Sequence, residues 1–322
     1  MGPAGYDAGR ADYTTPGLRY STDMNRGKLV LHWYVSQLDI PAPANFPPQA
    51  PSQSAVKSHF RRRLLVAAGL LAAVVVLLAV DMTLIEPFRI QVTHYQLHGP
   101  VTAPLKIAHL SDIHTHGNGR RERRLMEILR AENPDVILIT GDTLGVMNRY
   151  APAQNLYRQL HAPLGVWVVR GNFENDYRIP ARRERAIYDD AGVHLLVNAN
   201  HELRPDVWVA GLDDPTTGDA KLDAALAGIP GGVFSIVLFH SPSFFDVAAG
   251  RASLCLAGHT HGGQVRIPFM KPLWLPKGVG RYLDGWYEQQ GSKMYVSRGL
   301  GMSKLPIRFM CRPEVTFITV AP

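Results

Sequence analysis

From residue 105 onward, short apolar runs alternate with segments of helical periodicity. Five such runs are 105–110, 136–140, 166–170, 236–239 and 254–257. Continuous apolar runs of this length are typical of strands that are buried on both faces. Between the first two runs, the segment 120–132 places its apolar residues on one helical face and ends before Pro134. The pattern predicts an α/β domain over about 100–322.

Further elements are expected between and after these runs. Helices are predicted at 154–160, from Pro180 to near Gly192, and at 220–227; strands are predicted at 193–197, 207–212 and 315–320, with a hairpin about 290–292. A loop with three prolines and Trp274 covers 267–282. Loops of this length in a compact domain are often functional.

One apolar run differs from the others in length. Leu64 to Val80 is an uninterrupted run of 17 residues, extended past Asp81 by Thr83-Leu84-Ile85. This length is the lower limit for a helix that spans a bilayer. No small-x-small cleavage pattern follows it, which favours a retained anchor over a cleaved signal. We therefore expect a single-pass anchor over 61–85 in the inner (cytoplasmic) membrane.

The charge around the anchor favours one orientation. Eight Lys or Arg residues precede the run, including Arg61-Arg62-Arg63, and the positive-inside rule then places the following domain on the periplasmic or extracellular side. Arg61-Arg62 followed by Leu64-Leu65 also resembles a twin-arginine export signal, although other consensus positions differ. A monotopic anchor with a cytoplasmic domain is the alternative.

Composition separates the N-terminal segment from the rest of the chain. Residues 1–60 are rich in Pro, Gly, Ser, Tyr and Ala without periodicity, so that we expect this segment to be disordered. It and the basic residues up to 63 contribute much of the net charge of +7. The remaining domain is only mildly basic, which gives no argument for a nucleic-acid partner, and no feature indicates a protein partner. The two cysteines do not form a disulfide framework.

Polar residues that can bind metal ions follow the predicted strands. Asp112 and His114 follow the first run, Asp142 the second and Asn172 the third; His240 follows the fourth, and His259 and His261 follow the fifth within Gly258-His259-Thr260-His261-Gly262. Ligand sites in sheets of this kind lie beyond the strand ends. Neutral imidazole is the commonest metal ligand, and nitrogen and oxygen donors without thiolate suit Mn²⁺, Fe or Zn²⁺. Each residue taken singly also fits a structural role, such as capping a turn.

The motifs Asp112-x-His114, Gly141-Asp142, Gly171-Asn172, His240 and Gly258-His259-x-His261 resemble, in this order, the calcineurin-like metallophosphoesterase family. The ending from Ser297 to Glu314 resembles its membrane-anchored branch, which is related to UDP-2,3-diacylglucosamine hydrolases. The resemblance implies two packed mixed β-sheets flanked by helices, a four-layer sandwich. It also implies two divalent ions, with Mn²⁺ favoured: Asp112, His114 and His261 for one, Asn172, His240 and His259 for the other, and Asp142 as the bridge.

The chain departs from the family at two positions. Many members have His after the Gly-Asn pair, whereas this chain has Phe173, which cannot donate a proton. The acidic residue usually found three positions after the bridging Asp is replaced by Gly145. His116 and the arginines Arg121 and Arg124 are the candidates to assist catalysis instead, or the leaving group departs unaided.

These observations favour a membrane-anchored hydrolase of a phosphoester or pyrophosphate bond in a lipid-linked substrate such as UDP-2,3-diacylglucosamine. A broad-specificity phosphodiesterase acting on envelope or soluble substrates is the second reading. A metal-binding scaffold without turnover is a third, of another class. The nucleotide-activated precursors of lipid A are made on the cytoplasmic face of the membrane. The basic residues before the anchor favour the opposite side for the domain, so that the sequence leaves both sides as alternatives.

Overall fold

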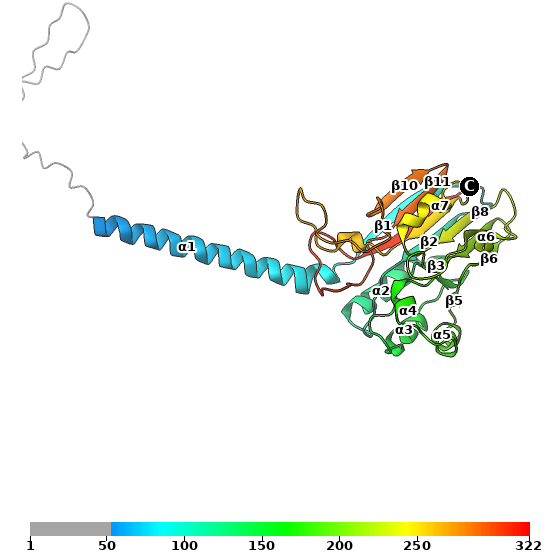
Figure 1. The fold of residues 1–322 in the computed structure, drawn as a ribbon, viewed down its shortest axis with the longest axis horizontal. Coiled ribbons are helices and arrows are strands. Elements are labelled where there is room, and N and C mark those ends of the chain that lie inside the picture. Colours follow the sequence, from blue (N-terminus) through cyan, green and yellow to red (C-terminus); the bar gives the residue numbers. More distant parts are fainter. Residues whose placement is uncertain (1–52) are drawn as a thin grey trace, which may run out of the picture. The chain divides into compact units, whose positions relative to one another are not determined.

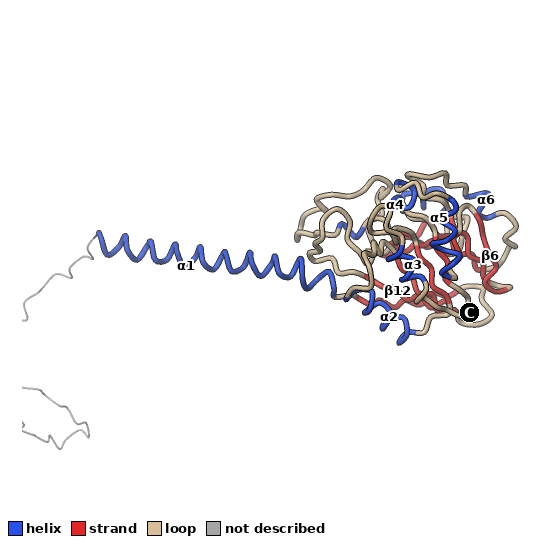
Figure 2. Tube along the Cα trace, turned by 90° about the horizontal axis from the view of Figure 1, so that it is seen from below, coloured by secondary structure: helices blue, strands red, loops and turns tan. Residues whose placement is uncertain are grey.

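The structure is a computed structural model that describes residues 53–322. The disorder predicted for 1–60 therefore falls mostly outside the described residues. Within them, twelve strands form two sheets of six. Much of the chain that connects the strands is loop, drawn tan in Figure 2.

The first sheet has the strand order β1-β12-β2-β3-β4-β5. Its strands are β1 (Gln91–His98), β2 (Leu105–Leu110), β3 (Val136–Ile139), β4 (Val166–Val168), β5 (His194–Leu195) and β12 (Glu314–Ala321). All neighbours run parallel except β12 and β2. The last strand of the chain thus lies between two strands from the start of the domain.

The second sheet has the order β10-β11-β9-β8-β7-β6. Its strands are β6 (Ala199–Arg204), β7 (Val207–Gly211), β8 (Phe234–Leu238), β9 (Leu254–Ala257), β10 (Gly285–Gln289) and β11 (Ser292–Val296). The pairs β6–β7 and β10–β11 are antiparallel, and the others are parallel. Both sheets are therefore mixed.

The helices cover the outer faces of the two sheets (Figure 1). They are α2 (Arg120–Glu132), α3 (Ala151–Tyr157), α5 (Ala181–Tyr188), α6 (Leu222–Leu226) and α7 (Phe245–Ala248), whereas the short α4 (Asn172–Asp176) follows the end of β4. Residues of α2, α3 and α5 pack on the first sheet, and residues of α6 and α7 pack on the second.

A separate apolar core fills the space between the sheets. Ile107, Leu138 and Ile318 of the first sheet and Ile236 and Leu256 of the second belong to it, and all are fully buried. Since strands with cores on both faces have no polar side, their sequences read as continuous apolar runs. The four-layer sandwich expected from the sequence is the observed fold.

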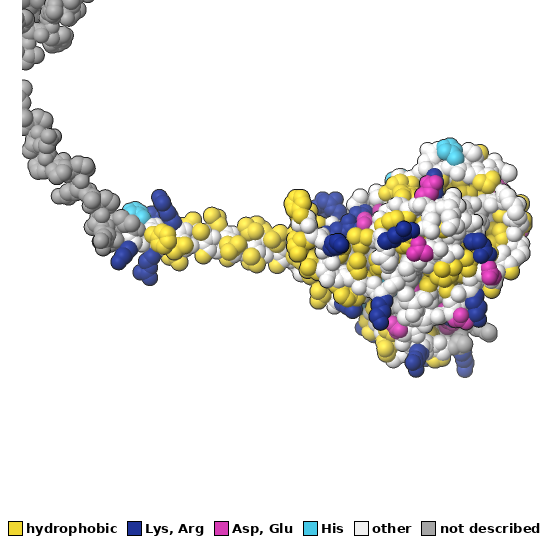
Figure 3. Space-filling view, turned by 45° about the horizontal axis from the view of Figure 1, so that its top comes forward, with side chains coloured by type: hydrophobic (Ala, Val, Ile, Leu, Met, Phe, Trp, Pro, Cys, Tyr) yellow, Lys and Arg dark blue, Asp and Glu magenta, His cyan; other side chains and the backbone are white. Residues whose placement is uncertain are grey.

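The apolar segment near the N-terminus is the long helix α1 (Gln53–Val80), followed by a π-helical turn (Asp81–Ile85) and a 3-10 turn (Glu86–Phe88). The helix begins at Gln53, so that 53–60 is helical and not part of the expected irregular segment. Among the described residues, one helical stretch, Lys57–Phe88, is long and apolar enough to cross a membrane. Figure 3 shows hydrophobic side chains along α1, with Lys and Arg at its first turns.

The turns that follow α1 are bonded to the segment before β12. The backbone N–H of Arg308 donates to Met82 O at 3.0 Å, and that of Met310 donates to Glu86 Oε2 at 2.8 Å. The Cys311 N–H donates to the other oxygen of Glu86. Glu86 is buried, and its carboxylate ties these turns to the C-terminal segment of the domain.

Most predicted elements are present, with shifted ends. The helix expected at 154–160 is observed at Ala151–Tyr157, and the expected hairpin turns at Gln290-Gly291 between β10 and β11. The sequence reading missed β1 and β6, whose polar residues give no apolar run, and the short helices α4 and α7.

Candidate metal centre

All seven residues expected to bind metal lie just after the strands named in the sequence analysis. Asp112 and His114 follow β2, Asp142 follows β3, Asn172 begins α4 after β4, His240 follows β8, and His259 and His261 follow β9. These are the carboxyl ends of parallel strands from both sheets. The structure brings the seven side chains together; their role as metal ligands stays a prediction.

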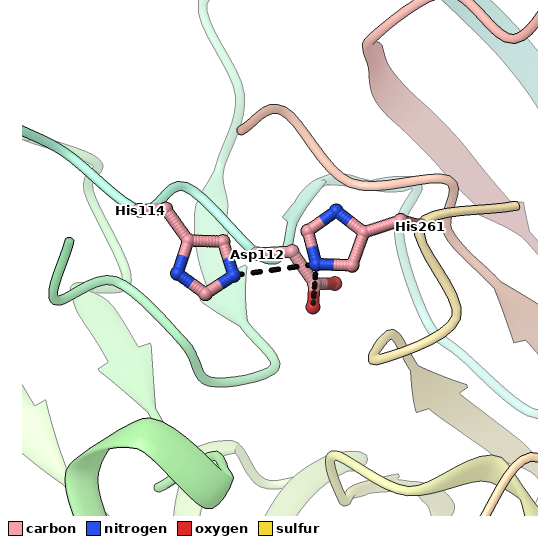
Figure 4. Close-up of side chains that lie close together, drawn as sticks. All are labelled: Asp112, His114 and His261. Carbon is pink, nitrogen blue, oxygen red and sulfur yellow. Dashed lines mark hydrogen bonds and ion pairs between the residues drawn. The ribbon is translucent and has the colours of Figure 1, made fainter. Parts of the chain in front are cut away.

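One group consists of Asp112, His114 and His261, whose donor atoms lie within 4.8 Å of one another (Figure 4). The Nε2 atoms of the two histidines face each other at 3.3 Å, with the rings stacked. Asp112 Oδ1 lies 3.5 Å from His261 Nε2. All three residues are buried.

A second group consists of Asp142, His240 and His259, also within 4.8 Å of one another. Asn172 joins it, because its Oδ1 lies 3.3 Å from His240 Nε2. Asp142 Oδ2 lies 3.3 Å from His240 Nε2 and 3.5 Å from His114 Nε2. One carboxylate oxygen therefore lies near a histidine of each group, which is the position that a bridging ligand requires.

Three of the histidines have one ring nitrogen near a backbone carbonyl. His114 Nδ1 lies 3.2 Å from Leu144 O, His240 Nδ1 lies 2.6 Å from Thr140 O, and His259 Nε2 lies 2.6 Å from Lys277 O. A ring N–H that donates to a carbonyl fixes the tautomer and leaves the other nitrogen with a lone pair. In each case the other nitrogen is the one available to its group.

The electrostatics of the site also suit cations. Burial lowers the pKa values of His114 and His259, and lowers that of His261 to about 3, so that these rings are neutral near pH 7. Burial opposes ionisation of Asp112, but the neighbouring histidines outweigh it and lower its pKa. Burial alone would lower the pKa of His240, whereas the Asp142 and Asp112 carboxylates raise it well above 6.5.

The donor set therefore fits divalent cations. Three neutral imidazoles, the His240 ring whose pKa the carboxylates raise, two carboxylates and one amide oxygen converge without a thiolate. The buried carboxylates near His240 provide negative charge that a cation would neutralise. Metals with mixed nitrogen and oxygen coordination, such as Mn²⁺, Fe and Zn²⁺, are the ones that this set suits.

The backbone of the site is strained. Asp112 (φ 48°), His114 (φ 41°), Asp142 (φ 52°), His259 (φ 70°) and His261 (φ 50°) all have positive φ. Non-glycine residues rarely adopt this conformation, and it persists where the surrounding structure imposes it, often at functional sites. The strain concentrates on five of the seven candidate ligands, and nothing in the sequence pattern indicates it.

Two glycines allow the loops to approach the carboxylates. A Cβ on Gly258 would lie 1.7 Å from Ser111 Oγ and 2.5 Å from Asp112 Oδ2. A Cβ on Gly171 would lie 2.2 Å from Asp142 Oδ1. Since such distances are far below van der Waals contact, only glycine fits at these two positions.

Glu174 is a residue of the site that the sequence reading missed. It is buried, and its Oε1 accepts the N–H groups of Thr143 and Leu144 at 2.9 and 3.1 Å. Its Oε2 accepts the N–H groups of Asp142 and Gly171, both at 2.9 Å. One carboxylate thus positions the loops that carry Asp142 and Asn172. The available signal was a glutamate three residues after Gly171, which is the spacing of a capping box.

The structure shows what surrounds the two positions at which the chain departs from the family motifs. The Phe173 ring packs edge-on against His114, with centroids 4.4 Å apart, so that a hydrocarbon lies where many members of the family have imidazole. A Cβ on Gly145 would lie 2.5 Å from Thr115 O. The backbone after His114 therefore occupies the space that a side chain at 145 would need.

The three residues proposed to assist catalysis are not part of the two groups. Arg121 is buried, and its Nη2 donates to Ile113 O at 2.9 Å and to Glu122 Oε1 at 2.9 Å. These bonds tie Arg121 to the loop before His114, and its part in catalysis stays a prediction. Arg124 is exposed on α2 and pairs with Glu127 at 2.8 Å. His116 is exposed beyond the His114 loop. The roles of His116 and Arg124 in catalysis likewise stay predictions.

Comparisons with known proteins agree with this chemistry. The sequence profile of the calcineurin-like phosphoesterase family matches residues 105–263. A Bacillus subtilis protein named uncharacterized metallophosphoesterase YkuE is 29% identical over 250 residues, covering 73% of this chain and 87% of its own length. Phosphodiesterase YaeI of Escherichia coli is 28% identical, covering 67% of this chain and 82% of its own length.

A relative from Danio rerio, named transmembrane protein with metallophosphoesterase domain, is 28% identical over 238 residues. The match covers 67% of this chain and 53% of that protein. The matched family profile ends at Gly263, two residues after the last candidate ligand, His261.

Proposed function

We propose that this chain, which belongs to the calcineurin-like phosphoesterase family, cleaves a phosphodiester or pyrophosphate bond in a lipid-linked substrate at a membrane surface. Its family and its relatives make it a metal-dependent phosphoric ester hydrolase. The main support for a two-metal hydrolase is the position of Asp142 Oδ2. This oxygen lies 3.3 Å from His240 Nε2 and 3.5 Å from His114 Nε2, between the two groups of candidate ligands.

Asp112, His114 and His261 would hold one divalent ion, and Asn172, His240 and His259 the other, with Asp142 shared. When bound, such ions supply Lewis-acid polarisation of the phosphoryl oxygens and lower the pKa of water toward neutrality. Mn²⁺ is our first choice, and Fe and Zn²⁺ are the alternatives. The chain's own contribution is to hold these donors in fixed positions, through Glu174 and through the carbonyls that orient the imidazoles.

Phe173 restricts the leaving group. No proton donor occupies this position, so that a leaving group there departs as an anion. A nucleoside monophosphate leaving from a pyrophosphate is a weakly basic anion and needs no such donor, whereas an alkoxide does. This argument favours UDP-2,3-diacylglucosamine or a similar activated lipid as the substrate.

The membrane anchor is the second part of the proposal. The side chains from Leu64 to Val80 are apolar and exposed, and a bilayer is the environment that such a helix requires. We place the domain on the periplasmic or extracellular side, from the basic residues before the span. A reporter fused after Pro322 that is active only in the cytoplasm would reverse this orientation and strengthen the lipid A precursor reading.

The test is hydrolysis by the purified full-length chain in detergent with Mn²⁺, Fe²⁺ or Zn²⁺. The substrates are UDP-2,3-diacylglucosamine, a soluble UDP-sugar and bis(p-nitrophenyl) phosphate. We expect the lipid-linked pyrophosphate to have the highest kcat/KM. Asp142→Asn should lower kcat by orders of magnitude and reduce bound metal from two ions per chain, whereas the exposed Asp189→Asn should do neither. Near-wild-type turnover and two ions in Asp142→Asn would contradict the dinuclear assignment.

A broad-specificity phosphodiesterase is the second candidate, favoured by the name of the relative YaeI. Equal kcat/KM for bis(p-nitrophenyl) phosphate and the lipid-linked substrate would support it. A scaffold without turnover would bind metal and hydrolyse none of the three substrates.

A further inference from the structure

A second charged site lies apart from the metal centre. A cavity of about 530 Å³ is lined by Phe88, Arg89, Ile90, Arg120, Arg123, Arg124, Glu127 and Arg312. We call it the arginine pocket. Five arginines face one carboxylate, and none of the candidate metal ligands lines the cavity. Its chemistry is that of an anion site without catalytic groups.

The arginine pocket begins where the apolar span ends. Phe88 is the last residue of the helical stretch Lys57–Phe88, and Arg89 and Ile90 follow it directly. Gln91 N donates to Pro313 O at 2.8 Å, which places the start of β1 beside the segment that carries Arg312. In a chain anchored by α1, residues at the end of the span lie at the level of the lipid headgroups.

The positive charge of this pocket is only partly compensated. Within 53–322, Glu127 is the one carboxylate that pairs with a lining arginine, through Arg124 at 2.8 Å, and both side chains are more than half exposed. Exposed pairs of this kind contribute little. Arg123 donates to a backbone carbonyl, Asn118 O, and the Arg120 guanidinium lies over the Phe88 ring at 5.5 Å.

The placement of these arginines on α2 is unfavourable without an anion. Arg120, Arg123 and Arg124 lie in the first turns of the helix, where positive charge opposes the helix dipole. Glu122, the acidic residue of the first turn, is buried and bonds Gly119 N and Thr115 Oγ1. It is therefore directed away from the pocket. A bound phosphate would offset both the dipole and the repulsion among the arginines.

We propose that the arginine pocket binds the phosphate headgroup of an anionic phospholipid in the membrane that α1 spans. The proposal rests on the anchor of the proposed function. Guanidinium groups form charge-assisted, bidentate bonds with phosphate oxygens. Phe88 and Ile90 supply an apolar wall on the side nearest the span, which suits the glycerol and upper acyl carbons of a lipid better than a fully hydrated ion.

The experiment measures lipid bound by the full-length chain in a neutral detergent, by native mass spectrometry. The added probes are phosphatidylglycerol, phosphatidylcholine and inorganic phosphate. The pocket variant is Arg89→Gln/Arg123→Gln/Arg312→Gln. The matched control, Arg158→Gln/Arg182→Gln/Arg251→Gln, removes three exposed arginines elsewhere in the domain. A single Arg312→Gln variant changes one lining arginine only. Thermal unfolding curves for all proteins confirm that folding is preserved.

We expect phosphatidylglycerol to bind more tightly than phosphatidylcholine, and the pocket variant to bind it roughly 100-fold more weakly, since each arginine near an anionic surface contributes about tenfold or less. The control should bind as the wild type does, and Arg312→Gln should lie between. Equal phosphatidylglycerol binding by all variants would overturn the proposal. Pocket-dependent binding of inorganic phosphate at the same concentration, without preference for phosphatidylglycerol, would also overturn it in favour of a soluble anion.

Lipid binding is read out without turnover, so that this result is independent of the substrate panel. A chain that hydrolyses none of the substrates can still show the lipid preference. A chain that leaves the membrane on alkaline carbonate extraction would instead refute the anchor on which the proposal rests.

Discussion

Glu174 Oε2 accepts the backbone N–H of Asp142 at 2.9 Å. The carboxylate of Glu174 thereby holds the backbone of the residue that lies between the two histidine groups. It also accepts three further N–H groups, from Thr143, Leu144 and Gly171. A neutral amide cannot replace it, because one of its two oxygens would become an N–H donor that faces other donors.

We therefore expect Glu174→Gln to destabilise the domain by about 1–3 kcal/mol, the usual cost of buried donors left unpaired. It should also lower metal occupancy, since Asp142 and Asn172 lie in the loops that Glu174 joins. Denaturant unfolding and metal analysis measure the two effects. The exposed Glu288→Gln is the control, and equal stability of the two variants would refute the positioning role.

Gly258→Ala tests the close approach of the two halves of the site. The added Cβ would lie 1.7 Å from Ser111 Oγ and 2.5 Å from Asp112 Oδ2, so that the His259 loop must move away from β2. We expect bound metal and kcat to fall together by at least tenfold. Gly231→Ala, whose Cβ meets no atom within 4 Å, should leave both unchanged. Wild-type metal content in Gly258→Ala would contradict this prediction, because it would show that the metal site tolerates the displacement of the His259 loop.

Phe173→His restores a possible proton donor beside His114. We expect it to accelerate the cleavage of an alkyl phosphodiester, where general acid assistance is typically worth about 10²–10⁴-fold. It should change the rate for a pyrophosphate or a p-nitrophenyl ester little, because those leaving groups need no proton. Steady-state kinetics on the two substrate types measure the difference, with Phe269→His on an exposed loop as the control. A uniform rate change for both types would remove the leaving-group argument.

His109 predicts a dependence of stability on pH. Burial lowers the pKa of His109 from 6.5 to about 4. Between these values the unfolded chain binds the proton more readily than the folded one, so that the stability present above pH 6.5 is lost as the pH falls toward 4. The loss for this one group is up to roughly 3 kcal/mol.

His109→Gln should therefore reduce the fall in the free energy of unfolding between pH 6.5 and 4, because Gln does not titrate and can still bond Thr140, which lies 2.9 Å from His109 Nε2. The exposed His161→Gln should follow the wild-type curve. Denaturant unfolding at four pH values in this range is the measurement. Parallel curves for the wild type and His109→Gln would show that another group causes the acid loss.

The sequence predicts the apolar strands and the order of the polar residues after them because both depend on local pattern. A continuous run such as 136–139 has to be buried, and the residue that follows it has to lie at a sheet edge. β1 was not predicted because polar residues interrupt its apolar positions, namely Gln91, Thr93, Gln96 and His98. It becomes a strand only by pairing with β12.

The function of Arg121 could not be predicted for a related reason. Its guanidinium bonds Ile113 O, eight residues earlier in the chain, and no pattern of charges reveals that a carbonyl will be available there. The left-handed backbone of Asp112, His114 and Asp142 likewise follows from the loops that meet at the site. Residue types were readable from the sequence, whereas their partners depended on tertiary structure.

The position of β12 has a consequence for biosynthesis. Glu314–Ala321 is hydrogen-bonded to β1 on one side and to β2 on the other. β1 and β2 therefore cannot complete the first sheet until the ribosome has made the chain as far as Ala321. Until then β1 has no neighbour in the first sheet and β2 lacks one, so that this sheet stays incompletely folded.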